Sequence, residues 1–237
     1  MDILPNGRSE RFAARRAAPS REVSIPPLDL AGTLNVPVGA RALVVFVHGS
    51  GSSRFSPRNR AVADALNGRA IATLLFDLLT EEEEANRANV FDIALLAERL
   101  AQTVDWIDRD SQLRRLPLGL FGASTGAAAA LVAAARLKGR IGAVVSRGGR
   151  PDLAGSALDG LGTPTLLIVG GDDFGVIELN EEALARLGGP KAIEIVPGAT
   201  HLFPEPGALE AVTAHAARWF EAYLANGGAQ RPRAPGH

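Results

Sequence analysis

The sequence predicts a single α/β domain built on a mostly parallel sheet. Two observations lead to this fold class. Short apolar runs alternate with longer segments of helical spacing, and a chain of 237 residues is long enough to bury one large core. A parallel sheet covered by helices on both faces produces this alternation, with right-handed crossovers between its strands. We therefore expect a doubly wound arrangement whose functional loops follow the carboxyl ends of the strands.

Six apolar runs fit buried parallel strands, and five longer segments fit helices. We expect strands at 42–47, 71–76, 118–121, 141–145, 165–169 and 192–196. We expect helices, from their apolar spacing or high alanine content, at 58–66, 91–107, 125–137, 176–187 and 208–224. The stretch 22–36, broken by Pro26, Pro27 and Gly32, predicts an antiparallel hairpin at one edge of the sheet.

The two ends of the chain have too little apolar content to pack. We expect residues 1–21 to form a flexible basic segment and residues 226–237, rich in Gly, Pro and Ala, to form a flexible tail. No apolar run follows the arginines of the first segment, so it does not resemble a secretory signal. The folded domain is then expected to span 22–225.

The composition limits the partners and sites that the chain can have. Basic and acidic residues nearly cancel, 25 against 26, which argues against a nucleic-acid partner. No stretch approaches the roughly 20 apolar residues of a membrane-spanning helix, so we expect no membrane partner. The absence of cysteine excludes disulfides, thiolate zinc sites and a cysteine nucleophile. We expect a cytoplasmic protein with no cofactor and no metal, and the oligomeric state stays open.

A sharp turn between a strand and a helix carries the candidate nucleophile. The segment Gly122-Ala123-Ser124-Thr125-Gly126 follows an apolar strand and opens an alanine-rich helix. In a Gly-x-Ser-x-Gly elbow the glycines let strand and helix pass closely, and the serine hydroxyl projects above the sheet. A simpler interpretation is a glycine-rich turn in which Ser124 caps the helix.

The candidate base and acid follow later strands in the predicted sheet. Of four histidines, His201 follows the strand 192–196 and precedes the last helix, where a loop residue can reach the functional edge. Histidine suits the task because it titrates near neutrality and can take a serine proton. Asp172 and Asp173 follow the strand 165–169, and either would complete the chain order Ser, Asp, His of this architecture.

A loop rich in glycine and serine follows the strand 42–47. It runs His48-Gly49-Ser50-Gly51-Ser52, and its glycines free the backbone so that the Ser50 N–H can point at a substrate carbonyl. The Thr125 N–H would be the second donor of this oxyanion hole. We also place His48 among the residues that line the substrate site. A phosphate-cradling loop is disfavoured, since the Walker lysine and Gly-x-Gly-x-x-Gly are missing.

Four arginines lie on the loops at the same edge of the predicted sheet. Arg54 and Arg58 follow the oxyanion loop, while Arg147 and Arg150 follow the strand after the elbow. Guanidinium groups bind carboxylate or phosphate through paired hydrogen bonds, so the four could read an anionic substrate. In the alternative interpretation they pair with the run 81–84 or with Asp152, or face water.

With these residues placed, the chain resembles the α/β-hydrolase superfamily, and within it the dienelactone hydrolase-like proteins that have no cap domain. The resemblance covers residues 40–225 and is carried by His48-Gly49, the elbow, Gly170-x-x-Asp173 and His201. In that superfamily the acid is usually the last residue of Gly-x-x-Asp, so the resemblance implies Asp173 rather than Asp172. One departure is that authentic dienelactone hydrolases use a cysteine nucleophile, so their substrate does not carry over to this chain.

The resemblance implies hydrolysis of a small-molecule ester, lactone or thioester through an acyl-enzyme on Ser124. A non-catalytic binding protein of the same fold and an acyltransferase are the competing hypotheses, and a complete triad argues against the first. The arginine-bearing segments around Arg54 and Arg147, with Leu78-Leu79-Thr80, are similar to segments in small bacterial hydrolases. Some of those hydrolases are fused to phosphoribosyltransferase domains.

Overall fold

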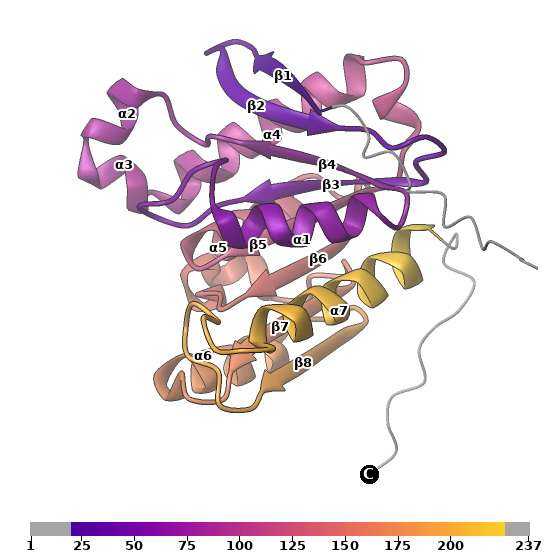
Figure 1. The fold of residues 1–237 in the computed structure, drawn as a ribbon. Helices are drawn as coiled ribbons and strands as arrows, with labels where there is room; N and C mark the ends of the chain where they lie inside the picture. Colours follow the sequence, from indigo (N-terminus) through magenta and orange to yellow (C-terminus); the bar gives the residue numbers. More distant parts are fainter. Residues whose placement is uncertain (1–19, 226–237) are drawn as a thin grey trace, which may run out of the picture.

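The computed structural model describes residues 20–225, which form an eight-stranded sheet between two layers of helices (Figure 1). The strand order is β1-β2-β4-β3-β5-β6-β7-β8. Neighbours from β4 to β8 run parallel, whereas β1 and β2 form an antiparallel hairpin that joins the edge of β4. The strands are β1 (Ser20–Ile25), β2 (Leu30–Asn35), β3 (Ala42–Val47), β4 (Ile71–Phe76), β5 (Leu118–Ala123), β6 (Ile141–Arg147), β7 (Thr165–Gly170) and β8 (Lys191–Val196). The predicted fold class is confirmed.

Helices cover both faces of the sheet. One face carries α1 (Pro57–Asn67) and α7 (Ala208–Phe220), which contact each other across the strands. The other face carries α4 (Ile93–Arg109), α5 (Thr125–Arg136), η2 (Pro151–Leu158) and α6 (Phe174–Arg186). The short helices α2 (Glu81–Ala85) and α3 (Arg87–Phe91) project beyond the edge of the sheet (Figure 1), and η1 (Leu113–Arg115) and η3 (Glu221–Ala225) complete the set.

The core consists of two apolar layers because side chains of a strand alternate between the faces of a sheet. In β3, Val45 packs into the layer under α4 and α5, and Phe46 packs into the layer under α1 and α7. The Phe46 ring lies against Phe121 of β5, with ring centroids 5.0 Å apart. Every residue of β3, β4, β5 and β7 is buried, which explains why these strands are continuous apolar runs in the sequence.

Most boundaries differ from the sequence prediction by one or two residues, and the largest difference is at α7, which ends at Phe220 rather than at 224 and is followed by η3. Strands β5 and β6 continue two residues further than their apolar runs, to Ala123 and Arg147, because neighbouring strands still pair there. Strand β1 begins at Ser20, two residues before the expected start of the hairpin. The rest of the expected flexible segment, residues 1–19, and the expected tail 226–237 lie outside the described residues. Among the helices of residues 20–225, none is long and apolar enough to cross a membrane.

Candidate active site

Ser124 stands on a strained turn between β5 and α5. Its backbone has φ 51° and ψ −123°, a conformation that non-glycine residues rarely adopt. The turn is tight, since a Cβ added to Gly122 would lie 2.5 Å from the Ala127 Cα, and one added to Gly126 would collide with the carbonyl of Val47. The Ser124 side chain makes no capping hydrogen bond to α5, so it does not serve as a helix cap.

The backbone of Ser124 is held by the segment that follows β6. The Ser124 N–H donates to the Arg147 carbonyl at 3.3 Å, and the Arg150 N–H donates to the Ser124 carbonyl at 3.1 Å. Asn180 of α6 donates its side-chain amide to the Gly149 carbonyl at 3.1 Å and steadies the same segment. The hydroxyl of the serine therefore projects from a turn whose main chain is tied on both sides.

His201 and Asp173 form a hydrogen-bonded pair at the same edge of the sheet. His201 Nδ1 lies 2.7 Å from Asp173 Oδ2, and the side chains of the two residues are 37% and 16% exposed. Asp173 directly precedes α6, whereas Asp172 is exposed and holds the turn through its backbone N–H. The loop of His201 is anchored by Phe203, which is buried and has a left-handed φ of 55°.

Gly148 brings the histidine loop beside the nucleophile segment. A Cβ added to Gly148 would lie 2.8 Å from the His201 carbonyl oxygen and 3.6 Å from His201 Nδ1. Gly148 is the residue after Arg147, whose carbonyl binds the Ser124 N–H. His201 and Ser124 thus lie on either side of the end of β6. No hydrogen bond joins the Ser124 hydroxyl to His201 within residues 20–225.

The loop after β3 packs against the elbow. A Cβ added to Gly49 would lie 2.9 Å from the Ser124 Cβ and 3.6 Å from its Oγ. The Ser50 N–H, expected to face a substrate oxygen, donates instead to the Thr125 hydroxyl at 3.0 Å. The structure therefore brings Ser50 and Thr125, the two expected oxyanion residues, together. The Ser50 N–H is bound by the Thr125 side chain.

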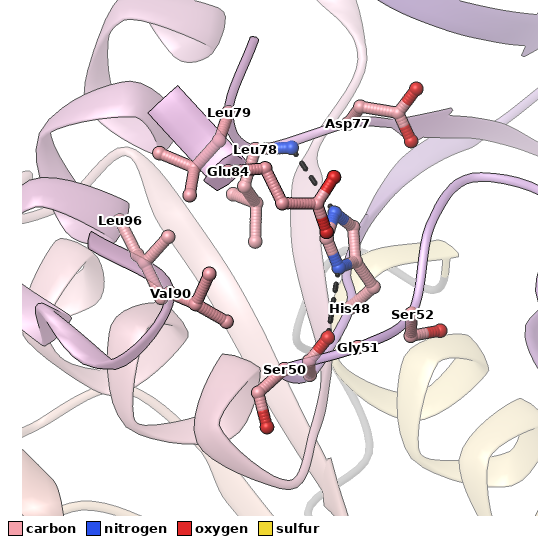
Figure 2. Close-up of a pocket in the computed structure, with 11 residues that line it drawn as sticks. His48, Ser50, Gly51, Ser52, Asp77, Leu78, Leu79, Glu84, Val90 and Leu96 are labelled. Atoms are coloured by element: carbon pink, nitrogen blue, oxygen red, sulfur yellow. Dashed lines mark hydrogen bonds between the residues drawn. The ribbon is translucent and has the colours of Figure 1, made fainter. Parts of the chain in front are cut away.

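The ring of His48 is hydrogen-bonded to the backbone on both sides. Its Nε2 accepts the Leu78 N–H at 3.1 Å, and its Nδ1 donates to the Gly49 carbonyl at 3.0 Å (Figure 2). Burial lowers the pKa of His48, because it disfavours the charged ring. Backbone groups engage both ring nitrogens, and a contact between His48 and substrate stays a prediction. The ring ties the loop after β3 to the loop after β4, beside a cavity of about 20 Å³.

The four arginines do not form one cluster. Arg54 forms an ion pair with Asp77 at the end of β4, and its guanidinium lies 4.1 Å from the centre of the Phe55 ring. Arg150 forms a two-pronged pair with Asp152, with Nε–Oδ1 and Nη2–Oδ2 distances of 2.8 and 2.7 Å. That pair raises the pKa of Arg150. Arg150 thus has the partner that the alternative interpretation named, whereas Asp77, the partner of Arg54, was named in neither interpretation.

Arg58 and Arg147 are the two arginines that the structure brings together. Arg147 is 6% exposed, and its Nη2 donates to Asn59 Oδ1 at 3.4 Å. Burial, and then the positive charge of Arg58, lowers the pKa of Arg147 to about 10. Neither guanidinium forms an ion pair with any carboxylate of the described residues.

The sequence analysis did not identify Asp77 and Asn59, the partners of Arg54 and Arg147. Asp77 directly follows a strand at the functional edge, and that position was a usable signal. Asn59 lies in the first turn of a helix without any distinguishing pattern, and no signal in the sequence could have linked it to Arg147.

Comparison with solved structures identifies first the class of protein. The fold matches that of Est1E from Butyrivibrio proteoclasticus with a TM-score of 0.72 at 17% identity, over 86% of this chain and 98% of that one. The chain has the fold of the α/β-hydrolase superfamily. The crystal structure of dienelactone hydrolase from Anabaena variabilis ATCC 29413 is 53% identical, with a TM-score of 0.83, over 87% of this chain and 97% of that one. The chain therefore belongs to the dienelactone hydrolase-like branch of that superfamily.

Two curated relatives have a name that differs from that of the solved structures. Two proteins from strains of Mycobacterium tuberculosis, each named "Putative phosphoribosyl transferase", are 57% identical to this chain over 207 residues. The match covers 87% of this chain and 47% of each relative, so the chain spans about half the length of the curated relatives it matches. No protein-family model matches the chain.

Proposed function

We propose that this chain is a serine hydrolase that cleaves a carboxylic ester, lactone or thioester of a small molecule. The observation that carries the proposal is the 2.7 Å hydrogen bond between Asp173 and His201, at the edge of the sheet where Ser124 stands on a strained elbow. Nucleophile, base and acid each follow a different strand, in the order that this architecture uses. Membership in a branch that includes dienelactone hydrolase supports the same chemistry.

The reaction begins with attack of Ser124 Oγ on the acyl carbon. His201 Nε2 takes the hydroxyl proton while its Nδ1–H stays hydrogen-bonded to Asp173, which fixes the tautomer and stabilises the imidazolium. The tetrahedral intermediate collapses, the bond to the leaving alcohol or thiol breaks, and the imidazolium returns its proton to that group. Water, deprotonated by His201, then attacks the acyl-enzyme and releases the acid.

Two backbone donors serve the developing oxyanion. The Thr125 N–H lies in the first turn of α5, where helix amides have no partner within the helix. The Ser50 N–H becomes the second donor once the Thr125 hydroxyl, which accepts it at 3.0 Å, turns away about its χ1 bond. Without substrate that hydroxyl is the acceptor of the Ser50 N–H, and substrate binding replaces one acceptor by another.

A fluorophosphonate probe tests the proposal directly. We expect the probe to label Ser124 of the native chain, and we expect Ser124→Ala to fold normally and lose at least about 10³ in kcat on any hydrolysed ester. Ser156→Ala, at an exposed position of η2, is the matched control and should keep both labelling and turnover. Labelling or turnover that survives in Ser124→Ala would contradict the assignment.

The name of the curated relatives concerns proteins about twice as long as the matched segment. We assign hydrolysis to the segment that this chain shares with them, because its site offers a nucleophile, a base and an acid for acyl transfer. Transfer to an alcohol instead of water uses the same acyl-enzyme. Product analysis in the presence of glycerol distinguishes the two: hydrolysis gives the free acid, and transfer gives a glycerol ester.

A further inference from the structure

Two neighbouring arginines beside the elbow carry charges that no carboxylate of the described residues neutralises. Arg147 is 6% exposed and closes β6, and Arg58 is the second residue of α1. The Nε atoms of both guanidinium groups are buried and have no hydrogen-bond partner. Buried charges in proteins are almost always paired, because leaving water costs an ion several kcal/mol. Two like charges placed together in this way call for an anion.

The contrast with the other two arginines lies in the missing carboxylate, because the buried Nε of Arg54 also has no hydrogen-bond partner. Arg54 and Arg150 each meet a carboxylate, Asp77 and Asp152. Arg147 meets only the neutral amide of Asn59, at 3.4 Å. The pKa of Arg147 is lowered by burial and by Arg58 but stands at about 10, so the side chain keeps its charge at neutral pH.

Helix α1 adds to the positive field at the same place. Its amino end carries no acidic residue in the first turn, and both Arg58 and Asn59 lie in that turn. The amino end of this 11-residue helix attracts anions mainly through its dipole, since Pro57 has no N–H and the Asn59 N–H is bound by the Ser56 hydroxyl. The buried arginine, the partly exposed arginine and the helix end therefore favour the same kind of ligand.

The backbone of Arg147 adjoins the elbow that carries Ser124. Arg147 lies opposite Ala123 in the sheet, and its carbonyl binds the Ser124 N–H at 3.3 Å. The Arg147 side chain extends from this position to Asn59 at the amino end of α1, so an anion held there would lie between α1 and the end of β6. Arg58, which is only half-buried, leaves the pair open to solvent on one side.

We propose that Arg58 and Arg147 bind a phosphoryl group of the substrate, a proposal that rests on the hydrolase function above. Charge decides between the candidate anions. A phosphate monoester carries about −1.5 to −2 at pH 7 and offers three acceptor oxygens, which matches two guanidinium groups. A carboxylate carries one charge and would leave one arginine uncompensated. The substrate class is therefore a phosphorylated ester or thioester whose phosphoryl group lies on α1 and β6.

Titration with inorganic phosphate tests the site without any turnover. We measure binding calorimetrically to the full chain at constant ionic strength, with acetate as the competing anion. The native chain and Ser124→Ala should bind phosphate alike, and acetate should bind at least tenfold more weakly. Arg58→Gln and Arg147→Gln should each weaken phosphate binding about tenfold or more, whereas Arg60→Gln, at an exposed position of the same helix, should not change it.

Hydrolysis of two matched esters provides the second measurement. The substrates are 1-acetylglycerol 3-phosphate and 1-acetylglycerol, which differ only in the phosphoryl group. Arg58→Gln should raise KM about tenfold for the phosphorylated ester and leave KM for the neutral one nearly unchanged. If Arg147→Gln does not fold, Arg58→Gln, at the half-buried position, decides both measurements.

The outcomes separate this proposal from the proposed function. Phosphate that does not bind, or that binds Arg58→Gln as tightly as the native chain, overturns the anion site even if Ser124→Ala is inactive. Acetate that binds as tightly as phosphate overturns the phosphoryl class. Conversely, a Ser124→Ala variant that still hydrolyses esters overturns the nucleophile, while phosphate binding would still stand.

Discussion

His48 and His201 both follow a strand at the carboxyl edge of the sheet, yet their surroundings differ in every respect. His48 is partly buried, and both of its ring nitrogens are bound to backbone groups of Leu78 and Gly49. The His201 side chain is 37% exposed, and one ring nitrogen binds Asp173 while the other remains available. A ring with both nitrogens engaged can hold two loops together but cannot exchange a proton. Availability of the second nitrogen, rather than the position in the fold, distinguishes the proposed base from the ring that holds two loops together.

The test with the largest expected effect removes Asp173, the residue proposed to orient His201. Asp173→Asn should lower kcat on the order of 10⁴, because an amide at this position favours the wrong imidazole tautomer. Steady-state kinetics on any ester that the native chain hydrolyses measures the effect. Asp172→Asn is the matched control and should change kcat little, since Asp172 is exposed and contributes its backbone N–H to the turn. A larger loss from Asp172→Asn would contradict the assignment of the acid.

A smaller effect, on stability rather than on rate, is expected at His48. His48→Leu should lower the free energy of unfolding by about 1–3 kcal/mol, because the buried Leu78 N–H loses its acceptor. His48→Gln places an amide oxygen near the position of Nε2 and should recover part of that loss. Urea denaturation of the three proteins measures both values. Equal stability of His48→Leu and the native chain would show that the ring does not hold the loops.

The smallest expected effect is the pH dependence that His48 adds to stability. Its pKa is lowered in the folded chain, so the unfolded chain takes up a proton at a higher pH than the folded one does. The stability that the neutral ring contributes is therefore fully present above the unfolded pKa of about 6.5. It is lost as the pH falls toward the folded pKa. The free energy of unfolding changes by at most about 1.4 kcal/mol per pH unit in this range. In urea titrations between pH 7.5 and 5, His48→Gln should lose stability less steeply than the native chain. Parallel curves would contradict the neutral ring.

The fold and the strand-end residues could be predicted from sequence because they depend on local pattern. Buried strands such as β5 and β7 are uninterrupted apolar runs, and the ends of β5, β7 and β8 bring Ser124, Asp173 and His201 to one edge of the sheet. The direction of each side chain could not be predicted in the same way. The Thr125 hydroxyl reaches Ser50 across 75 positions of sequence, and Arg147 reaches Asn59 across 88. The sequence therefore predicted four arginines at one edge. Only tertiary packing determines that two of them form ion pairs with carboxylates and two do not.

The turn of Ser124 has a consequence for motion. Its N–H and its carbonyl are hydrogen-bonded to Arg147 and Arg150, so we expect the elbow and the end of β6 to move together. Adjustment to a substrate must come from the other partners: the rotor of the Thr125 hydroxyl, the loop of Ser50 and the half-exposed ring of His201. We expect Ser124 to keep its position relative to β6 while these groups adjust. A ligand that shifts the end of β6 should therefore shift Ser124 with it.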